Sequence, residues 1–142
     1  MRVIGLDLGS RRIGVAVTDE LGLSAHPHAT IERHGGQRDL DAIRQVVVAQ
    51  GASRVVIGLP LSPQGERGPA ALAAERFADR LRAVLDVPID LIDESFTTVE
   101  ATDVLLEADL SRARRKQVVD RVAAALILRR WLDAQRPGGT AA

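Results

Sequence analysis

The chain of 142 residues contains no cysteine, which excludes disulfide bonds and any metal site built from thiolates. It also lacks an apolar run of the roughly 18–20 residues that a membrane-spanning helix requires. Asp7 and the pair Arg11 and Arg12 interrupt the N-terminal segment too early for a signal peptide. We therefore expect a cytoplasmic protein without a membrane association.

Aromatic side chains are scarce, at 2% of the sequence. They are Phe77, Phe96 and Trp131, and each is expected in the core. So few rings leave little for stacking on exposed bases. If the chain binds nucleic acid, we therefore expect it to recognise shape and phosphates rather than a single strand.

The chain has no net charge, because 19 lysines and arginines balance 19 acidic residues. A zero sum argues against a protein wrapped in nucleic acid. The charges are segregated, however: segment 86–109 holds acidic residues and no basic ones, and a basic block follows at 112–116. This pattern is consistent with a metal site beside a phosphate-binding rim, and equally with ordinary solvated surface.

The hydrophobic pattern predicts three strands, followed by helices and strands in alternation. The strands are expected over 3–8, 13–17, 29–32, 54–58 and 89–92. Helices are expected after Gly36, from Pro69, over 101–107 and over 116–134. Three antiparallel strands in a meander followed by two parallel strands make a five-stranded mixed sheet with helices on both faces. This α/β, RNase H-like element order predicts one domain over 1–136 and a flexible tail over 137–142.

Asp7 lies in the middle of the first predicted strand, where a lone carboxylate is costly to bury. A repeat of two places Val3, Gly5, Asp7 and Gly9 on one face of the strand. The flanking glycines leave room for a ligand to approach. The alternative is that Asp7 forms an ion pair with a nearby arginine.

Two further carboxylates stand out. Asp120 lies close to the packed side of the last predicted helix, and the alternative is a surface pair with Lys116. Asp93 and Glu94 end the fifth predicted strand, where neighbouring side chains face opposite ways. Only one of the two can face Asp7, and the pattern alone does not choose between them. Either could instead cap the following helix.

Carboxylates from three separate segments, in a chain without cysteine, indicate a hard divalent cation such as Mg²⁺ or Mn²⁺. Two such ions about 4 Å apart can activate a water molecule and stabilise the leaving oxygen of a phosphodiester. The chemistry that the residues indicate is therefore metal-dependent phosphodiester hydrolysis.

Four segments of the sequence, in this order, resemble the YqgF family, whose members have an RNase H-like fold and are related to Holliday-junction resolvases. They are 4–19 with its Gly-Leu-Asp-Leu-Gly run, 56–60, 93–101 and 116–124, and together they span nearly the whole chain. The resemblance implies a nuclease that processes the 5′ end of pre-16S rRNA, or one that resolves Holliday junctions. It also implies that Asp7, Glu94 and Asp120 hold the metal and carry catalysis, which favours Glu94 over Asp93.

The sequence departs from the family at Ser95 and Phe96, where the family usually has arginine and leucine. If that arginine contacts a phosphate, other basic residues must supply the contact. We expect the nucleic acid to be bound by six of them: Arg11, Arg12, Arg112, Arg114, Arg115 and Lys116. The Gly65–Gly68 loop is also expected near the phosphate backbone. In the usual strand order of this fold, the first and fifth strands are roughly 9–10 Å apart, so Glu94 has to reach inward.

Two other classes of function compete with a nuclease. Actin-like ATPases and sugar kinases share the fold and a similar first loop, but they need two such domains around a cleft. A non-catalytic nucleic-acid-binding or regulatory domain could keep the carboxylates for structure alone. The sequence leaves open whether the partner is an rRNA precursor or branched DNA, and whether the protein is a monomer or a homodimer.

Overall fold

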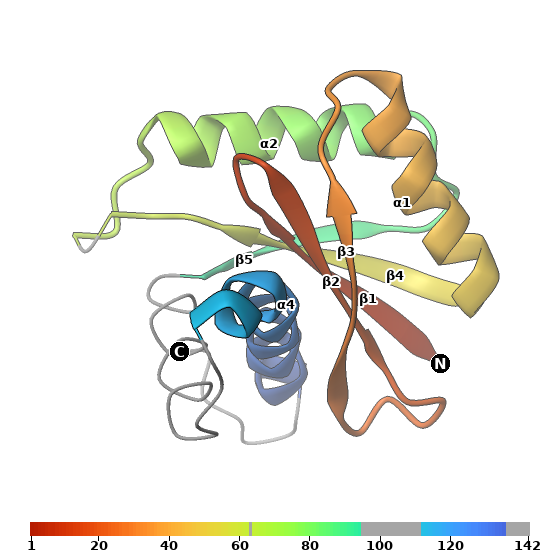
Figure 1. Cartoon of the computed structure of the whole chain (residues 1–142). Helices are drawn as coiled ribbons and strands as arrows, with labels where there is room; N and C mark the ends of the chain where they lie inside the picture. Colours follow the sequence, from red (N-terminus) through yellow and green to blue (C-terminus); the bar gives the residue numbers. More distant parts are fainter. Residues whose placement is uncertain (63, 95–111, 136–142) are drawn as a thin grey trace.

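The computed structural model describes residues 1–62, 64–94 and 112–135, and these residues form a sheet with three helices (Figure 1). In chain order the elements are β1 (Arg2–Leu8), β2 (Arg12–Thr18), β3 (Ala25–Glu32), α1 (Gln37–Gln50), β4 (Ala52–Leu59), α2 (Pro69–Arg82), β5 (Ile89–Asp93) and α4 (Arg112–Gln135). The helix predicted over 101–107 and the tail predicted over 137–142 lie outside the described residues.

The five strands form one mixed sheet in the order β3-β2-β1-β4-β5. Strands β1, β2 and β3 are antiparallel neighbours, whereas β4 runs parallel to both β1 and β5. The predicted meander and the two predicted parallel strands are therefore confirmed. In this order β4 lies between β1, which carries Asp7, and β5, which ends just before Glu94.

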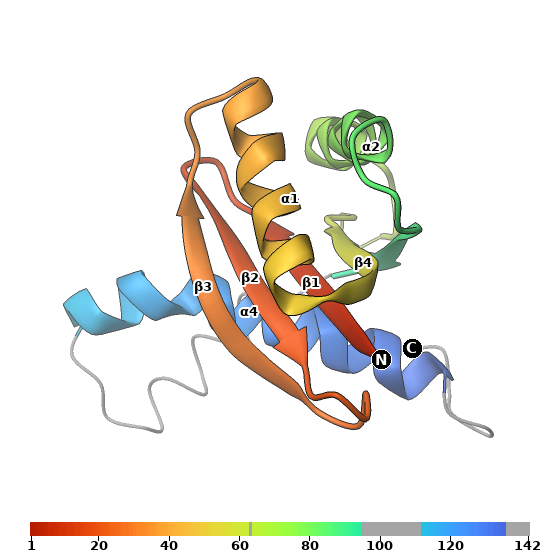
Figure 2. The ribbon, with the colours of Figure 1, turned by 90° about the vertical axis from the view of Figure 1, so that its right-hand side faces the viewer.

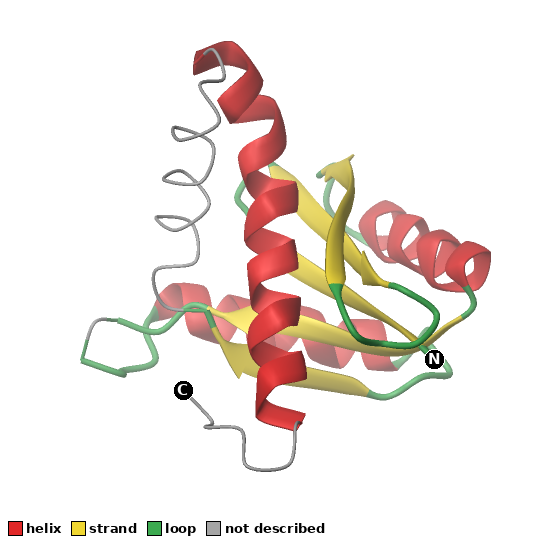
Figure 3. Ribbon diagram, turned by 90° about the horizontal axis from the view of Figure 1, so that it is seen from below, coloured by secondary structure: helices red, strands yellow, loops and turns green. Residues whose placement is uncertain are grey.

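Helices cover both faces of the sheet. Helices α1 and α2 lie on one face, and α4 crosses the other (Figures 2 and 3). The core under α1 and α2 contains Ile4 and Leu6 of β1 together with Ile43, Phe77 and Leu81. The core under α4 is separate, and its buried members are Val3, Ala16, Val56, Ala124, Ala125, Ile127, Leu128 and Trp131. The alternation of β1 between the two cores is the repeat of two that its sequence predicts.

The helix boundaries follow local signals in part. Helix α1 ends at Gly51, which has a left-handed backbone (φ 60°) and donates its N–H to the carbonyls of Val47 and Val48. Helix α2 begins at Pro69, as proline in a first turn predicts. Helix α4 begins at Arg112 rather than at 116, so the basic block belongs to its first turns. The prediction began too late because this segment lacks an apolar repeat, although arginine, alanine and lysine favour helices.

Strand β3 begins at Ala25, four positions before the predicted start. The sequence does not predict this first part of the strand, because its apolar alternation is interrupted by exposed His26, Pro27 and His28. Proline is tolerated because β3 is an edge strand, and the register with β2 shifts at this point. Among the described helices, none is both long and apolar enough to cross a bilayer.

Candidate active site

Asp7 lies on the face of β1 that α4 covers, and only 7% of it is exposed. Its partner on β2 is Gly14. On the other side, the parallel pairing of β1 with β4 ends at Leu6 and Ile57, so Gly58 is the next residue of β4 along from that pair. The carboxylate therefore stands in the sheet between two strands whose nearest residues carry no side chain.

Glu94 follows β5 directly and continues its pairing, because its N–H donates to the carbonyl of Leu59 at 3.1 Å. Two residues earlier, Ile92 packs against the core under α4, and Asp90 accepts a hydrogen bond from Trp131 Nε1 at 3.0 Å. Glu94 shares this face by the repeat of two and is 8% exposed. Asp93 is exposed on the surface, so Glu94 is the residue that faces the α4 side with Asp7.

The carboxyl groups of Asp7 and Glu94 are neighbours, because hydrogen bonding with Glu94 is among the causes that set the pKa of Asp7. Two strands that flank a common neighbour are roughly 9–10 Å apart, so this contact requires one side chain to cross β4. Glu94 does so directly over Gly58: a Cβ atom placed on Gly58 would lie 2.8 Å from Glu94 Cδ. The inward reach that the strand order demands of Glu94 is therefore present in the structure.

Asp120 approaches the pair from α4. This helix contacts β2 backbone to backbone, and a Cβ atom on Gly14 would overlap the carbonyl group of Asp120 and lie 3.0 Å from its Cβ. Because Gly14 is the partner of Asp7, the Asp120 side chain begins next to Asp7. It is partly buried. The pairing of Asp120 with Lys116 is not tested, since the side chain of Lys116 lies outside what the structure describes.

Glu94 and Asp120 both act on the ionisation of Asp7. Burial raises the pKa of Asp7 from its ordinary 3.8 to about 6; the hydrogen bond with Glu94 opposes this rise, and the charge of Asp120 adds to it. Burial also raises the pKa of Asp120, which the positive charge of Arg12 lowers and the negative charge of Glu32 raises. Burial and the neighbouring charge of Asp120 therefore both disfavour the ionised form of Asp7.

Arg12 is a basic residue whose charge acts on Asp120. Its Nε lies 3.2 Å from Glu32 Oε1 in an exposed ion pair across β2 and β3. Within the described part of the chain no arginine forms an ion pair with Asp7, so the alternative in which Arg11 or Arg12 neutralises Asp7 is not observed. Arg11 is exposed in the turn between β1 and β2.

This turn is held by a network that the sequence did not reveal. Arg33 donates its backbone N–H to the carbonyl of Arg11 at 2.9 Å and its Nη1 to the carbonyl of Gly9 at 2.7 Å. Asp39, which is 2% exposed, lies 3.8 Å from Arg33 Nε and accepts the N–H of His34 at 2.9 Å. An acid in the first turn of a predicted helix was the available signal, but such an acid is usual at an exposed helix start.

The other predicted contacts with nucleic acid lie in two places. Arg112, Arg114, Arg115 and Lys116 occupy the first turns of α4, whose later turn carries Asp120, and their side chains are not described. The loop before α2 is closed on itself: Gly65 donates its N–H to the carbonyl of Ser62 at 2.8 Å. In the same loop, Arg67 is bound by both oxygens of Glu75 at 2.7 and 2.6 Å.

The donor set agrees in chemistry with a hard divalent ion. Asp7 and Glu94 are oxygen donors in direct contact, and a cation can take the place of the proton between them. Among the described residues, no three acidic or histidine side chains stand close enough together to form a complete metal-ligand cluster. The structure thus brings two of the three predicted ligands into contact and places the third beside them.

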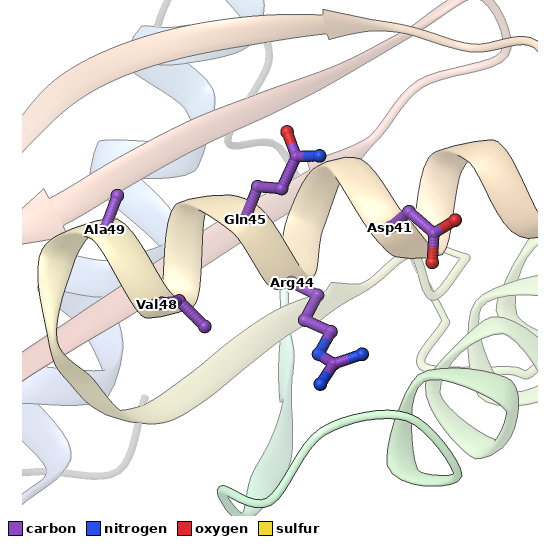
Figure 4. Close-up of a pocket in the computed structure, with 5 residues that line it drawn as sticks. All are labelled: Asp41, Arg44, Gln45, Val48 and Ala49. Carbon is purple, nitrogen blue, oxygen red and sulfur yellow. The ribbon is translucent and has the colours of Figure 1, made fainter.

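A cavity of about 510 Å³ lies elsewhere, against the outer surface of α1 (Figure 4). Its lining residues all come from that helix and are Asp41, Arg44, Gln45, Val48 and Ala49. Because α1 covers the face of the sheet opposite to α4, this cavity is not part of the carboxylate site (Figure 2).

Known proteins with similar sequences cover almost the entire chain. A protein of Myxococcus xanthus named "Putative pre-16S rRNA nuclease" is 51% identical over 140 residues, which is 99% of this chain and 93% of that protein. A protein of Moorella thermoacetica with the same name is 47% identical over 133 residues, or 94% of this chain and 95% of the relative.

Two solved structures of junction resolvases are similar to this one, at identities that show the fold alone. RuvC of T. thermophilus, in complex with a Holliday junction substrate, has a TM-score of 0.52 and 18% identity, and the match covers 95% of each chain. The fowlpox virus resolvase in complex with Holliday junction DNA has a TM-score of 0.57 and 10% identity, covering 96% of this chain and 100% of that one. The prediction of an RNase H-like fold is confirmed.

The family described as "RuvX: Holliday junction resolvase" matches residues 1–134, and it is the family that the sequence segments resemble under the name YqgF. The chain therefore belongs to the RuvX (YqgF) family.

Proposed function

We propose that this chain is a metal-dependent nuclease that hydrolyses phosphodiester bonds of structured nucleic acid. Asp7 and Glu94 are its central metal ligands, and Asp120 is the third acidic group of the site. The observation that carries the proposal is the direct contact between Asp7 and Glu94, two buried carboxyl groups from distant parts of the chain.

This contact is difficult to explain as a device for stability. Placing one buried acid beside another costs free energy unless a proton or a cation lies between them, and apolar side chains of similar size would pack there at no such cost. Mg²⁺ or Mn²⁺ would stabilise both ionised carboxylates, polarise a phosphoryl oxygen and activate a water molecule. The pair is therefore better explained as a cation site than as part of the core.

The order of the acids supports two ions rather than one. Asp7 contacts Glu94 on its β4 side, and Asp120 approaches it on its β2 side. Asp7 would therefore hold metal together with both Glu94 and Asp120. Water and substrate oxygens would complete the coordination that the side chains leave open.

We further propose that the substrate is the precursor of 16S rRNA at its 5′ end and that the protein acts in the cytoplasm. Relatives at about half identity over nearly the full chain are named "Putative pre-16S rRNA nuclease", which supports the precursor as the substrate. A Holliday junction is the second candidate, because the family description and the junction complexes of the structural neighbours favour it. Exposed Arg11 and the basic first turns of α4 are suited to phosphates in either substrate.

The test is cleavage of a 16S leader RNA and of a four-way DNA junction, with Mg²⁺ or Mn²⁺ in the buffer. We expect Asp7→Asn, Glu94→Gln and Asp120→Asn to lower cleavage by well over 100-fold, because even groups that merely support a metal ligand are worth about 10–100-fold. Asp93→Asn, which removes the exposed acid next to Glu94, is the matched control and should cleave at the native rate.

Each outcome separates the classes of function. Cleavage of the leader RNA but not of the junction would identify the RNA as substrate, and the reverse result would identify the junction. Tight binding without cleavage by the native chain would favour the non-catalytic regulatory domain. Native rates in Asp7→Asn would show that the carboxyl pair is not the catalytic centre.

A further inference from the structure

Glycines occupy the sheet positions on both sides of Asp7. Gly14 of β2 is the direct partner of Asp7, and Gly58 of β4 is the residue after Ile57, where the pairing with β1 ends. Both lie on the face that α4 covers, since their absent side chains would point at Asp120, Ile127 and Glu94. Elsewhere on these strands, the positions that face α4 include Ala16 and Val56.

Backbone conformation does not require glycine at either position. The described glycines with a positive φ are Gly22, Gly35, Gly36, Gly51 and Gly65, and all of them lie in turns or at helix ends. Gly14 and Gly58 have strand conformations that any residue adopts. What distinguishes them is the space that a side chain would fill.

At Gly58 that space is occupied by Glu94. A Cβ atom would lie 2.9 Å from Glu94 Cβ and 2.8 Å from Glu94 Cδ, and 2.6 Å from Ile127 Cδ1. The end of Ile127 can rotate away, as the far end of a flexible side chain does. Glu94 cannot retreat in the same way without leaving Asp7, because its path to Asp7 runs over this position.

At Gly14 the space is occupied by the backbone of α4. A Cβ atom would overlap the carbonyl group of Asp120, so the helix itself would have to move. Gly5 provides a comparison, because it also lies under α4: its Cβ would meet Ala124 O and Leu128 Cβ, both at 3.0 Å. The space beside Gly5 is therefore filled by α4 and does not admit the ligand that the sequence suggests, whereas the contacts at Gly14 and Gly58 involve the acids.

We propose that Gly58 is a positioning residue that allows Glu94 to cross β4 and join Asp7, and that Gly14 does the same for Asp120 by letting α4 approach β2. The inference rests on the metal site proposed above. The metal site therefore depends on the absence of side chains at Gly14 and Gly58 as much as on its carboxylates. An added methyl group at Gly58 should separate the ligands while leaving every carboxylate in the sequence.

The test measures Mn²⁺ binding by isothermal titration calorimetry, with thermal denaturation of each variant alongside. We expect Gly58→Ala to weaken Mn²⁺ binding by about 10–100-fold, the range seen when a group that orients a ligand is lost. Gly5→Ala should lower the melting temperature through its 3.0 Å contacts yet bind Mn²⁺ within about twofold of the native protein. Cleavage should fall in Gly58→Ala and persist in Gly5→Ala.

A second variant guards against misfolding. Gly58→Ala combined with Ile127→Val removes the Cδ1 atom that the new methyl group would meet and keeps the conflict with Glu94. Ile127→Val alone is its control and should bind Mn²⁺ normally. Weak Mn²⁺ binding by the folded double variant supports the positioning role, and native affinity overturns it.

The variant Asp7→Asn distinguishes a failure of the positioning role of Gly58 from a failure of the proposed function. If Asp7→Asn loses Mn²⁺ binding while the double variant keeps it, the metal site stands and the role of Gly58 is refuted. If Asp7→Asn binds Mn²⁺ as the native chain does, the metal site and the positioning role fall together.

Discussion

The two faces of the sheet are built from alternate residues of the same strands, yet they differ in the size and polarity of their side chains. Under α1 and α2, β1 and β2 contribute Ile4, Leu6, Ile13 and Val15, all without solvent exposure. Under α4, the same strands contribute Val3 and Ala16 together with Gly5, Asp7 and Gly14. The first face contains what a stable core requires, and the second contains small residues and an acid that a core does not need.

This difference indicates that one face of the sheet mainly stabilises the fold and the other mainly forms the site. The face under α1 and α2 supplies the hydrophobic free energy that holds the fold together. The α4 face contributes less hydrophobic free energy, because an acid pair and glycines stand where branched side chains could pack. The same residues form the proposed cation site. Substitutions on neighbouring residues of one strand should therefore have opposite consequences for stability and for activity.

The largest effect on stability is expected at Leu6, the neighbour of Asp7 that faces α1 and α2. Leu6→Ala leaves a cavity among fully buried side chains and should lower the free energy of unfolding by about 2–5 kcal/mol. Urea denaturation measures this loss. The folded fraction should keep its cleavage rate and its Mn²⁺ affinity. A loss of metal binding in folded Leu6→Ala would mean that the two faces are not independent.

The next effect is the pH dependence of stability, which should be confined to the α4 face. The pKa of Asp7 is raised from 3.8 to about 6 in the folded chain, mainly by burial. Its protonated form is therefore favoured by folding, so this contribution to stability is complete below pH 3.8 and is lost as the pH rises through about 6. The rise in the pKa of Asp7 means that about 3 kcal/mol of this contribution to the free energy of unfolding has been lost at neutral pH.

Denaturation of metal-free native protein and of Asp7→Asn between pH 4 and 8 measures this contribution. We expect the native chain to lose stability relative to Asp7→Asn over that interval, and Mn²⁺ at pH 8 to restore it in the native chain only. Parallel stability curves for the two proteins would show that burial does not penalise the ionised form of Asp7. Asp93→Asn should follow the native curve, because Asp93 is exposed.

Much of this division could be predicted from the sequence, and the part that could not is spatial. The repeat of two placed Asp7 opposite Leu6, and it placed Glu94 on one face with Asp90 and Ile92, as the structure has them. The choice between Asp93 and Glu94 depends on which face of β5 meets α4, and only tertiary packing settles that. The family resemblance supplied the choice where the residues left it open.

The roles of Gly14 and Gly58 were beyond prediction for a related reason. A glycine in a strand indicates a bulge or a close approach, but the pattern does not say what approaches. Gly58 lies opposite Ile92 on β5, and only the strand order places it between Glu94 and Asp7. The network of Arg33 and Asp39 likewise joins the loop after β3 to the turn after β1, a contact that no local repeat records.

The smallest expected effect concerns the rim of the α4 face, where Arg12 and Glu32 act on Asp120 in opposite directions. The charge of Glu32 raises the pKa of Asp120, so Glu32→Gln should lower that pKa and shift the acid limb of the pH–rate profile for cleavage to lower pH. Arg12→Gln should shift it to higher pH, because the positive charge of Arg12 lowers the same pKa. Both side chains are exposed, so high salt should reduce either shift.

Glu75→Gln is the matched control for these two variants, since it breaks an exposed ion pair with Arg67 beside α2, away from the carboxylates. Its pH–rate profile should coincide with the native one. Shifts of Arg12→Gln and Glu32→Gln in the same direction would mean that the acid limb reports a group other than Asp120. Opposite shifts would show that the charges of Arg12 and Glu32 at the edge of the α4 face act on Asp120. Arg12 and Glu32 would then adjust the pKa of Asp120, whose position depends on Gly14. The core under α1 and α2 would be affected by neither the charges nor the glycine.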